Sequence, residues 1–487
     1  MKSFVTLTMT CTVFLLGLGF TSSYAQKLEE SLEVWLEQEP VQDGVHELRQ
    51  NKKRVIVYFQ AAPFQDRSGP SVTEAIEAEE QFNRSRLIRN WVQVVRESPA
   101  VDLIWSANAV VSEVTRSDLR RLNRDDQVVK VIEDRVFTME RPRPEANRTR
   151  TDESKLTYGL QVMNVPSVWD QGYTGRGVLV GVLDTGIDLE HPNLKGRVVA
   201  HRDFTNENDI KDGNGHGTHV AGTIAGNDHG GTAIGVAPDS ELIIAKIFDS
   251  RGRTQLSSIL NAMQWMLSAR DPARPDQPVH VASNSWGAAI PFILGFADSV
   301  RSWRRFGIFP NFAAGNSGSR PLSVGAPASY SFSFAVGAVD ENMNITSFSS
   351  RGPSVWLPRW DMEDPRWFQG WWPQLLKKPE VSAPGLNVLS AIPNGELRRY
   401  SGTSMATPHV AGVLALILEA NPHLTIEELE EILNETAQSR GAEGKNNTYG
   451  HGVVQADVAV ERALEVLGGK SPGFEDRNPN NWHWHEP

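Results

Sequence analysis

The hydrophobic pattern of the chain changes near residue 150. Downstream of it, short and nearly continuous apolar runs recur, at 178–183, 242–248, 280–284 and 309–314. Runs of this length without polar alternation are typical of strands buried on both faces of a parallel sheet. Helical stretches between them supply the crossovers that parallel strands require. The pattern therefore predicts a three-layer α/β/α domain with a central, mainly parallel sheet.

Residues 26–138 have a different texture, rich in charge and poor in glycine. Their periodicity predicts a small α+β domain with helices at 72–95 and 115–122. Strands are predicted at 54–59, 102–106, 109–111 and 128–137. We expect its core to come from Leu119, Leu122, Val129, Val131 and Val136.

One apolar run, 410–418, is hydrophobic on nearly every face and predicts a helix buried in a large core. Ser404 would lie in the first turn of this helix, among small residues. Free N–H groups and the positive end of the helix dipole favour an oxyanion there. Taken alone, the same stretch also fits an ordinary helix start with a capping serine.

The first 25 residues have a positive start, an apolar centre at 4–20 and a small-residue end at Ala25. This pattern predicts a signal peptide that is removed after Ala25. A single membrane anchor is the alternative, but the apolar centre is short and interrupted by threonines. No later segment is expected to be long and apolar enough to span a bilayer.

Composition narrows the class of protein. With 487 residues and 40% hydrophobic content, the chain can form more than one domain and a large core. A net charge of −11 argues against nucleic acid or an anionic membrane as the main partner. The only cysteine, Cys11, lies in the predicted signal peptide. The exported chain would have no disulfide, which is compatible with a bacterial exterior.

Two polar segments flank the large domain, which we place at 156–468. Residues 139–155 contain prolines and several arginines and predict an exposed processing linker. Self-cleavage within 137–155 is one hypothesis, and cleavage by a trypsin-like processor is the alternative. Residues 469–487 are rich in Asn and Pro and predict a flexible tail.

Three motifs carry the candidate chemistry. Asp184 ends a buried strand, His216 begins a small-residue helix, and Ser404 begins the apolar helix. The chain order Asp, His, Ser is one of three known for such triads. On these motifs, the chain resembles the subtilisin-like serine proteases (subtilases) over about residues 158–467. It is similar to the bacterial secreted members.

The resemblance and the chemistry assign the same roles. A serine hydroxyl needs an adjacent base, so Ser404 would be the nucleophile and His216 the base. Asp184 would orient the imidazole and stabilise its protonated form. His219 lies about one helical turn further on and is expected to be structural. Asp188 lies beyond the turn and is expected to be a loop residue.

The resemblance also implies an oxyanion hole and substrate contacts. Asn316, together with the N–H of Ser404, would stabilise the tetrahedral oxyanion. The segment Ser285, Trp286 and Gly287 would pair with an extended substrate. The pocket for the residue preceding the cut would be lined by Ala313, Ala314, Gly315 and Gly325. Small walls without a carboxylate predict a preference for Leu, Phe, Tyr or Met at that position.

No cofactor is expected for catalysis, and a structural calcium is the open question. The resemblance implies a calcium loop at 227–233. However, Asn193 stands where the family usually has aspartate, and His229 stands where it often has asparagine, whereas Ca²⁺ prefers oxygen ligands. Asp203, Asp209 and Asp212 either form another site or lie in a solvated loop. We therefore assign no metal ligand.

An insertion at 355–376 departs from the family pattern. It contains Trp356, Trp360, Trp367, Trp371 and Trp372. Aromatic residues at this density can form a surface for a partner or polymer. They can equally fasten a long loop onto the domain.

We therefore expect a secreted serine endopeptidase, extracellular or periplasmic, that acts as a monomer on proteins or peptides. Residues 26–138 would be a ferredoxin-like inhibitory propeptide, and the enzyme a self-processing zymogen. An unrelated N-terminal domain is the alternative for this region. For the whole chain the alternatives are a narrow-specificity processing protease, which recruits its partner through the insertion, and an inactive binding homologue.

Overall fold

The computed structural model describes residues 28–37, 52–60, 72–95, 98–139, 143–144, 155–289, 294–356 and 374–468. The predicted signal peptide, the tail and most of the linker and insertion lie outside the described residues. The chain forms two compact units. The first takes in Met1–Arg67, Glu77–Arg135 and Gln255–Ser257, and the second Ser68–Ile76, Val136–Thr254 and Ser258–Pro487.

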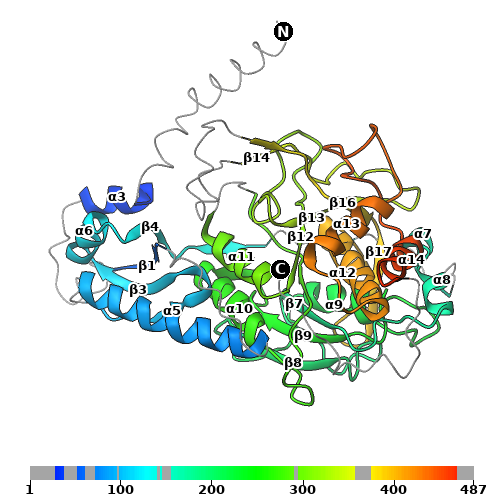
Figure 1. The fold of residues 1–487 in the computed structure, drawn as a ribbon, viewed down its shortest axis with the longest axis horizontal. Helices are drawn as coiled ribbons and strands as arrows, with labels where there is room; N and C mark the ends of the chain where they lie inside the picture. Colours follow the sequence, from blue (N-terminus) through cyan, green and yellow to red (C-terminus); the bar gives the residue numbers. More distant parts are fainter. Residues whose placement is uncertain are drawn as a thin grey trace, which may run out of the picture. The chain divides into compact units, whose positions relative to one another are not determined.

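The first unit is built on a four-stranded antiparallel sheet (Figure 1). In the order of the sheet the strands are β2 (Asp102–Ile104), β3 (Ala109–Thr115), β1 (Lys52–Phe59) and β4 (Val128–Glu133). Its helices are α3 (Glu30–Glu37), α5 (Val72–Val94) and α6 (Arg116–Arg124). The sheet and helices confirm the predicted α+β class for this region.

The predicted core of this unit is only partly right. Leu119, Leu122 and Val131 are fully buried, but Val129 is 56% and Val136 is 62% exposed. The register between β1 and β4 shifts so that Tyr58 pairs with Lys130 and Phe59 with Val128. Val129 is therefore the extra residue of a bulge, which resets the alternation of faces. Val136 belongs to a separate strand, β5 (Val136–Thr138).

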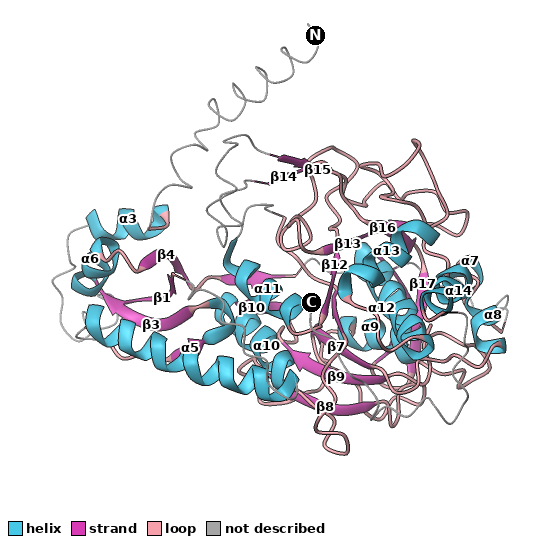
Figure 2. Ribbon diagram, in the orientation of Figure 1, coloured by secondary structure: helices cyan, strands magenta, loops and turns pink. Residues whose placement is uncertain are grey.

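The second unit contains the predicted parallel sheet, with seven strands (Figure 2). In the order of the sheet they are β16 (Val381–Pro384), β13 (Phe334–Val339), β12 (Phe309–Ala313), β11 (Val281–Asn284), β7 (Leu179–Asp184), β9 (Glu241–Lys246) and β8 (Val198–Asp203). All the neighbouring pairs are parallel. From β7 the chain first builds β8 and β9 on one side and then the other four strands on the opposite side.

Helices cover both faces of the sheet, which completes the three layers. Val180 and Val182 of β7 belong to the same core cluster as residues of α9 (His216–Ala225) and α12 (Thr403–Ala420). Gly181, between them, faces the other way, because a Cβ there would lie 2.8 Å from the Met266 sulfur of α10 (Leu256–Ser268). On that side, α10 packs with α11 (Ala297–Arg305) through a hydrogen bond from the Trp303 indole to the Met263 carbonyl, 2.8 Å long.

Helix α12 is buried at every residue. By length and composition it is able to cross a membrane, contrary to the expectation that no segment after residue 25 would qualify. The whole of this stretch is nevertheless buried inside the protein, as in the core helix of a globular domain. Its small residue Gly412 allows a neighbouring segment to approach it closely, because a Cβ there would lie 2.5 Å from the Cβ of Val236.

Further strands and helices complete the second unit. The Trp-rich insertion leaves it through β14 (Ser354–Trp356) and returns through β15 (Gln374–Leu376), which pair antiparallel. Trp356 is buried against Tyr330 and Phe332, so this one tryptophan fastens the base of the insertion. The other four lie outside the described residues. This unit also contains β6 (Arg143–Pro144), β10 (Arg253–Gln255), β17 (Val388–Ile392), β18 (Glu396–Ser401), α7 (Tyr158–Val162), α8 (Val165–Asp170), η3 (Leu294–Phe296), α13 (Ile426–Thr436) and α14 (Ala456–Val466).

We predict that Gly412→Ala destabilises the protein, although alanine is the better helix former by about 1 kcal/mol. A Cβ at residue 412 would lie 2.5 Å from the Val236 Cβ, so neighbouring backbone must move. Overpacking of this kind costs about 1–3 kcal/mol. Denaturant unfolding of Ser404→Ala proteins, which cannot digest themselves if Ser404 is the nucleophile, measures the difference. Glu431→Ala, at an exposed site of α13, should change stability by less than about 0.5 kcal/mol. Equal or higher stability of Gly412→Ala would contradict the packing argument.

Candidate active site

The candidate residues gather at the point where the order of the sheet reverses. Strand β7 lies between β11 and β9, and the chain leaves β7 and β11 toward opposite edges of the sheet. Ligands of open α/β sheets bind outside the carboxyl ends of the strands at such a point. Asp184 is the last residue of β7, Ser285 directly follows β11, and Asn316 follows β12.

Asp184 and His216 form a fully buried pair. The Nδ1 atom of His216 lies 2.7 Å from Oδ1 of Asp184, and neither side chain is exposed. His216 is the first residue of α9, preceded by Gly215 with a φ of 93°. Burial by itself would lower the pKa of His216, but the charge and hydrogen bond of Asp184, with the charge of Asp212, outweigh it and raise that pKa. The pair can therefore hold a proton on the imidazole.

Ser404 lies in the first turn of α12 and is 9% exposed. Its hydroxyl donates to the carbonyl oxygen of Ser285 at 2.9 Å, and the Ser285 hydroxyl donates to the carbonyl oxygen of Ser404 at 2.8 Å. The Nε2 atom of His216 is buried without a hydrogen-bond partner in the described part of the chain. The structure thus holds the serine in place through Ser285, and leaves Nε2 able to accept a proton.

Two hydrogen-bond donors converge beside Ser404. The side-chain oxygen of Asn316 accepts from the N–H of Thr403 at 2.9 Å and from its hydroxyl at 3.0 Å. These bonds leave the Asn316 amide group to donate. The position that a Cβ on Gly402 would take lies 3.6 Å from Asn316 Nδ2 and 3.6 Å from the backbone nitrogen of Ser404. The Asn316 side chain, whose Oδ1 is 3.7 Å from the same point, and the Ser404 nitrogen therefore border one small space, and an oxyanion hole needs two such donors.

The predicted substrate segments lie together, joined by backbone bonds. The N–H of Gly325 donates to Ala314 at 3.3 Å, and the N–H of Ala288 donates to Ala326 at 2.9 Å. Gly315 has a φ of 104° and donates its N–H to the Thr403 hydroxyl at 3.2 Å. Ser285 and Gly287 flank Trp286, and Ala313 ends β12.

The Trp286 ring is buried against Phe296 and Phe312, with ring centroids 5.5 Å and 5.7 Å away. Any contact of Trp286 with a substrate must therefore come from its backbone.

The two competing residues behave as expected from the sequence. His219 is buried, and its Nε2 lies 3.0 Å from the Val388 carbonyl oxygen. Burial lowers its pKa to about 3, so it stays neutral and structural. Asp188 is half-buried, and its carboxylate accepts from the N–H groups of Glu190 and Asn394. It therefore belongs to the loop after β7.

The residues at the implied calcium loop do not fit a cation. Asn193 is buried and donates its side-chain amide to the carbonyl oxygens of Asn227, at 2.9 Å, and His229, at 3.2 Å. A donor occupies the position from which Ca²⁺ would need an oxygen ligand. These two bonds satisfy carbonyls that would otherwise need a cation or water.

The three aspartates of the neighbouring loop do not converge either. Asp203 accepts from the N–H groups of Thr205 and Asp209, whereas Asp212 is buried and bonded elsewhere. No group of three or more His, Cys, Asp or Glu in the described residues could hold a metal ion. The reading of Asp212 as part of a solvated loop is wrong. Its position just before a helix, where an acid can satisfy free N–H groups, was the available signal.

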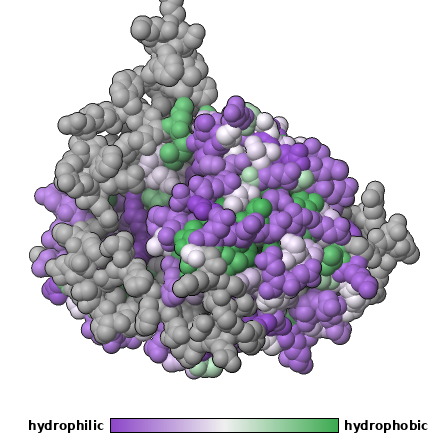
Figure 3. Space-filling model, turned by 45° about the vertical axis from the view of Figure 1, so that its right-hand side comes forward, coloured by the Kyte–Doolittle hydropathy of each residue, from purple (hydrophilic) through white to green (hydrophobic). Residues whose placement is uncertain are grey.

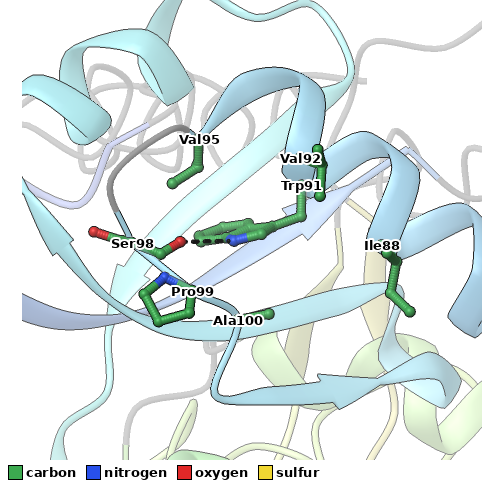
Figure 4. Close-up of a pocket in the computed structure, with 7 residues that line it drawn as sticks. All are labelled: Ile88, Trp91, Val92, Val95, Ser98, Pro99 and Ala100. Atoms are coloured by element: carbon green, nitrogen blue, oxygen red, sulfur yellow. Dashed lines mark hydrogen bonds between the residues drawn. The ribbon is translucent and has the colours of Figure 1, made fainter.

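The described surface also has an apolar hollow outside this site. On the face shown in Figure 3 the described surface is mostly hydrophilic, with small groups of hydrophobic residues. A hollow in the first unit, at the end of α5, has no ionisable side chain among the described residues that line it, and the indole of Trp91 donates across it to the Ser98 carbonyl (Figure 4). It is lined by Ile88, Trp91, Val92, Val95, Ser98, Pro99 and Ala100. Its one hydroxyl, that of Ser98, donates to the Asp118 carboxylate at 2.7 Å, and no histidine, cysteine or lysine is among these lining residues.

Comparisons with known proteins match the part of the chain that contains these candidate residues. A model described as the Subtilase family matches residues 175–452. The chain is 31% identical to the Alkaline protease of Alkalihalobacillus alcalophilus over 453 residues, 92% of this chain and 97% of that protein. It is 33% identical to Subtilisin E of Bacillus subtilis over 361 residues, 73% of this chain and 81% of that protein. It is 36% identical to Bacillopeptidase F of Bacillus subtilis over 344 residues, 64% of this chain but only 22% of that protein.

We predict that removal of calcium leaves the thermal stability of this protein unchanged, because the Asn193 amide already satisfies the loop carbonyls. A bound ion would stabilise by about 2.7 kcal/mol at a hundred times its Kd. Thermal midpoints with EDTA and with added calcium measure this. In the Asn193→Asp variant, which replaces the donor by an acceptor, EDTA should lower the midpoint and calcium restore it. A clear loss of wild-type stability in EDTA would contradict the conclusion that the Asn193 amide takes the place of a cation in this loop.

Proposed function

We propose, since this chain belongs to the subtilase family of serine endopeptidases, that Asp184, His216 and Ser404 are its catalytic triad. The observation that carries this proposal is the buried pair of Asp184 and His216, with its free Nε2, at the edge of the sheet where Ser404 begins α12. Its substrates are proteins and peptides.

The reaction begins when the Ser404 hydroxyl turns from the Ser285 carbonyl toward His216. Nε2 of His216 takes the proton as the oxygen attacks the substrate carbonyl, and Asp184 stabilises the resulting imidazolium. Asn316 Nδ2 and the Ser404 N–H donate to the oxyanion. His216 then protonates the leaving amine. Water, activated by the same histidine, hydrolyses the acyl-enzyme and regenerates Ser404.

The backbone segments around Gly287 and Ala314 would bind an extended substrate and accept a large apolar residue before the cut. The inactive homologue is disfavoured because every catalytic position is filled. A narrow processing protease that recruits a partner through the Trp-rich insertion remains the second candidate. Burial of Trp356 removes one of its five tryptophans from such a surface.

The enzyme would be a secreted monomer that is made as a self-processing zymogen, with residues 26–138 as inhibitor. The proposal of self-processing is supported by the contacts that the described ends of the linker make within the second unit. The Met139 N–H donates to the Gly252 carbonyl at 2.8 Å, just after β5 pairs with β10. Arg143 pairs with Ser401, three residues before Ser404, through β6 (Arg143–Pro144). Arg143 thus lies beside the strand that leads into α12, which supports a cut in the linker close to the nucleophile.

Ser404→Ala should abolish hydrolysis and leave the proform uncut. Intact mass and N-terminal sequence of wild type and variant measure this, and the wild-type N-terminus should fall within residues 138–155. A cut variant would overturn the nucleophile or the self-processing. A wild type that stays intact yet reacts with a fluorophosphonate would place maturation with another protease.

Asn316→Ala should lower kcat by about 10²–10³, as removal of one such donor does in subtilisin, with little change in KM. The donor acts mainly on charge that develops in the transition state, so ground-state binding is spared. Steady-state kinetics per titrated active site measure both constants. Ser317→Ala, at the next residue, should stay near wild type. A rise in KM at constant kcat would assign Asn316 to substrate binding instead.

A further inference from the structure

Asp212, in the loop before α9, is a carboxylate with only 6% of its surface exposed. Its Oδ1 atom accepts from the Thr185 hydroxyl at 2.8 Å, the Asn214 N–H at 3.0 Å and the Gly215 N–H at 2.8 Å. Its Oδ2 atom accepts from the N–H and the hydroxyl of Thr218, both at 2.8 Å. Five donations therefore converge on this one carboxylate, and both of its oxygens are fully bonded.

These donors flank both residues of the buried pair. Thr185 directly follows Asp184, and Gly215 directly precedes His216. The Thr185 hydroxyl that donates to Asp212 also accepts from the Gly217 N–H at 2.8 Å. One carboxylate therefore joins the end of β7 to the first turn of α9, which are the two elements that carry the pair.

The contact between these elements leaves little room to adjust. A Cβ at Gly217 would lie 2.3 Å from the Gly186 carbonyl oxygen, so the turn after β7 is packed directly on α9. If the bonds to Asp212 were lost, the donors of Thr185 and Thr218 would be buried without partners. The helix would then have to move relative to the strand, and the 2.7 Å contact between His216 and Asp184 would change.

Asp212 also acts through its charge. In the described residues no Lys or Arg forms an ion pair with it, and the buried Lys246 is paired with Glu207 at 2.9 Å. Its negative charge therefore reaches His216, where it adds to that of Asp184 in raising the pKa. The elements around His216 carry further titratable or charged groups: Asp188 after β7, Glu241 and Lys246 on β9, His219 on α9, Glu396, Arg398, Arg399 and Tyr400 on β18, and His409 and Glu419 on α12.

We propose that Asp212 is a positioning residue for the reaction: it holds Asp184 and His216 in register, and its charge favours the imidazolium that forms when Ser404 attacks. This inference rests on the triad proposed above. Asp212 touches neither substrate nor reacting atoms, so it acts only through the other two residues.

Two variants separate position from charge. Asp212→Asn keeps the shape of the side chain and removes its charge. Its NH₂ group replaces one of the two oxygens, so it faces either the donors that now bond Oδ1 or those that now bond Oδ2. We expect kcat/KM to fall by about ten- to a hundredfold at nearly constant KM, as for loss of a hydrogen bond to a charged group. The midpoint of the acid limb of kcat/KM, which reports the free-enzyme histidine, should shift to lower pH by about half a unit or more. The direction follows because loss of a nearby negative charge favours neutral imidazole.

Asp212→Glu keeps the charge and displaces the oxygens, so its rate should fall without a shift of the midpoint. Asp188→Asn is the matched control. The Asp188 carboxylate lies in the same region, but its side chain makes no hydrogen bond to α9. This variant should therefore match wild type in both rate and midpoint. If Asp212→Asn fails to mature, Thr185→Val removes the hydroxyl that links Asp212 to Gly217. Its rate should fall several-fold with an unmoved midpoint.

A wild-type rate and midpoint in Asp212→Asn would overturn the inference, as would a wild-type rate in Thr185→Val should the first variant not fold. A lower rate with an unmoved midpoint in Asp212→Asn would refute the role of its charge. His216→Ala tests the triad itself: if it stays active, the proposed function fails. If it is inactive while Asp212→Asn is normal, only the role of Asp212 fails.

Discussion

The structure depends on the complete burial of α12. A helix that is apolar on every face is stable only where other elements cover all of it, and here the parallel sheet, α9 and α14 do so. Burial fixes the axis of the helix, and the axis fixes where its first turn lies. Ser404 therefore stands at the carboxyl edge of the sheet because of hydrophobic packing that extends to Ala420. The reactive group is small, but its position is set by a large part of the core.

Buried polar groups then determine how the remaining elements are placed against this helix. Glu419, near the far end of α12, accepts from the N–H groups of Thr174 and Gly175 at 2.6 Å and from that of Arg176 at 3.1 Å. Burial raises the pKa of Glu419, and these three bonds oppose that rise. Asp212 accepts in the same way from backbone N–H groups at the start of α9. Buried carboxylates are costly unless they are fully bonded, so each holds one arrangement of the backbone.

Asn193 also satisfies buried backbone groups, but with a neutral side chain instead of a carboxylate. Loop carbonyls that point inward need a cation, a water molecule or a donor. A neutral amide supplies the donor without bringing a second charge into the interior. The loop at 227–233 can in this way keep its shape in a family whose members often use an ion there.

The sequence by itself determined the features that depend on local pattern. Continuous apolar runs predicted the parallel strands, the fully apolar run predicted the buried helix, and the Asp, His and Ser motifs placed Asp184, His216 and Ser404 at the ends of elements. These predictions succeed because strands, helices and their termini have periodicities and residue preferences that one segment carries alone. The bulge at Val129 escaped prediction, because an unpaired residue is defined only by the register of two strands.

Only the tertiary structure decided which polar groups share a site. The position of Asp212 before α9 was compatible with bonds to free N–H groups of that helix, but nothing in the sequence showed that Thr185, which follows β7, would also bond it. Likewise, the residue numbers gave no sign that the Asn193 amide would meet the Asn227 and His229 carbonyls. Burial and hydrogen bonding between distant segments depend on how the whole sheet and its helices pack, and no local pattern of residues contains that information.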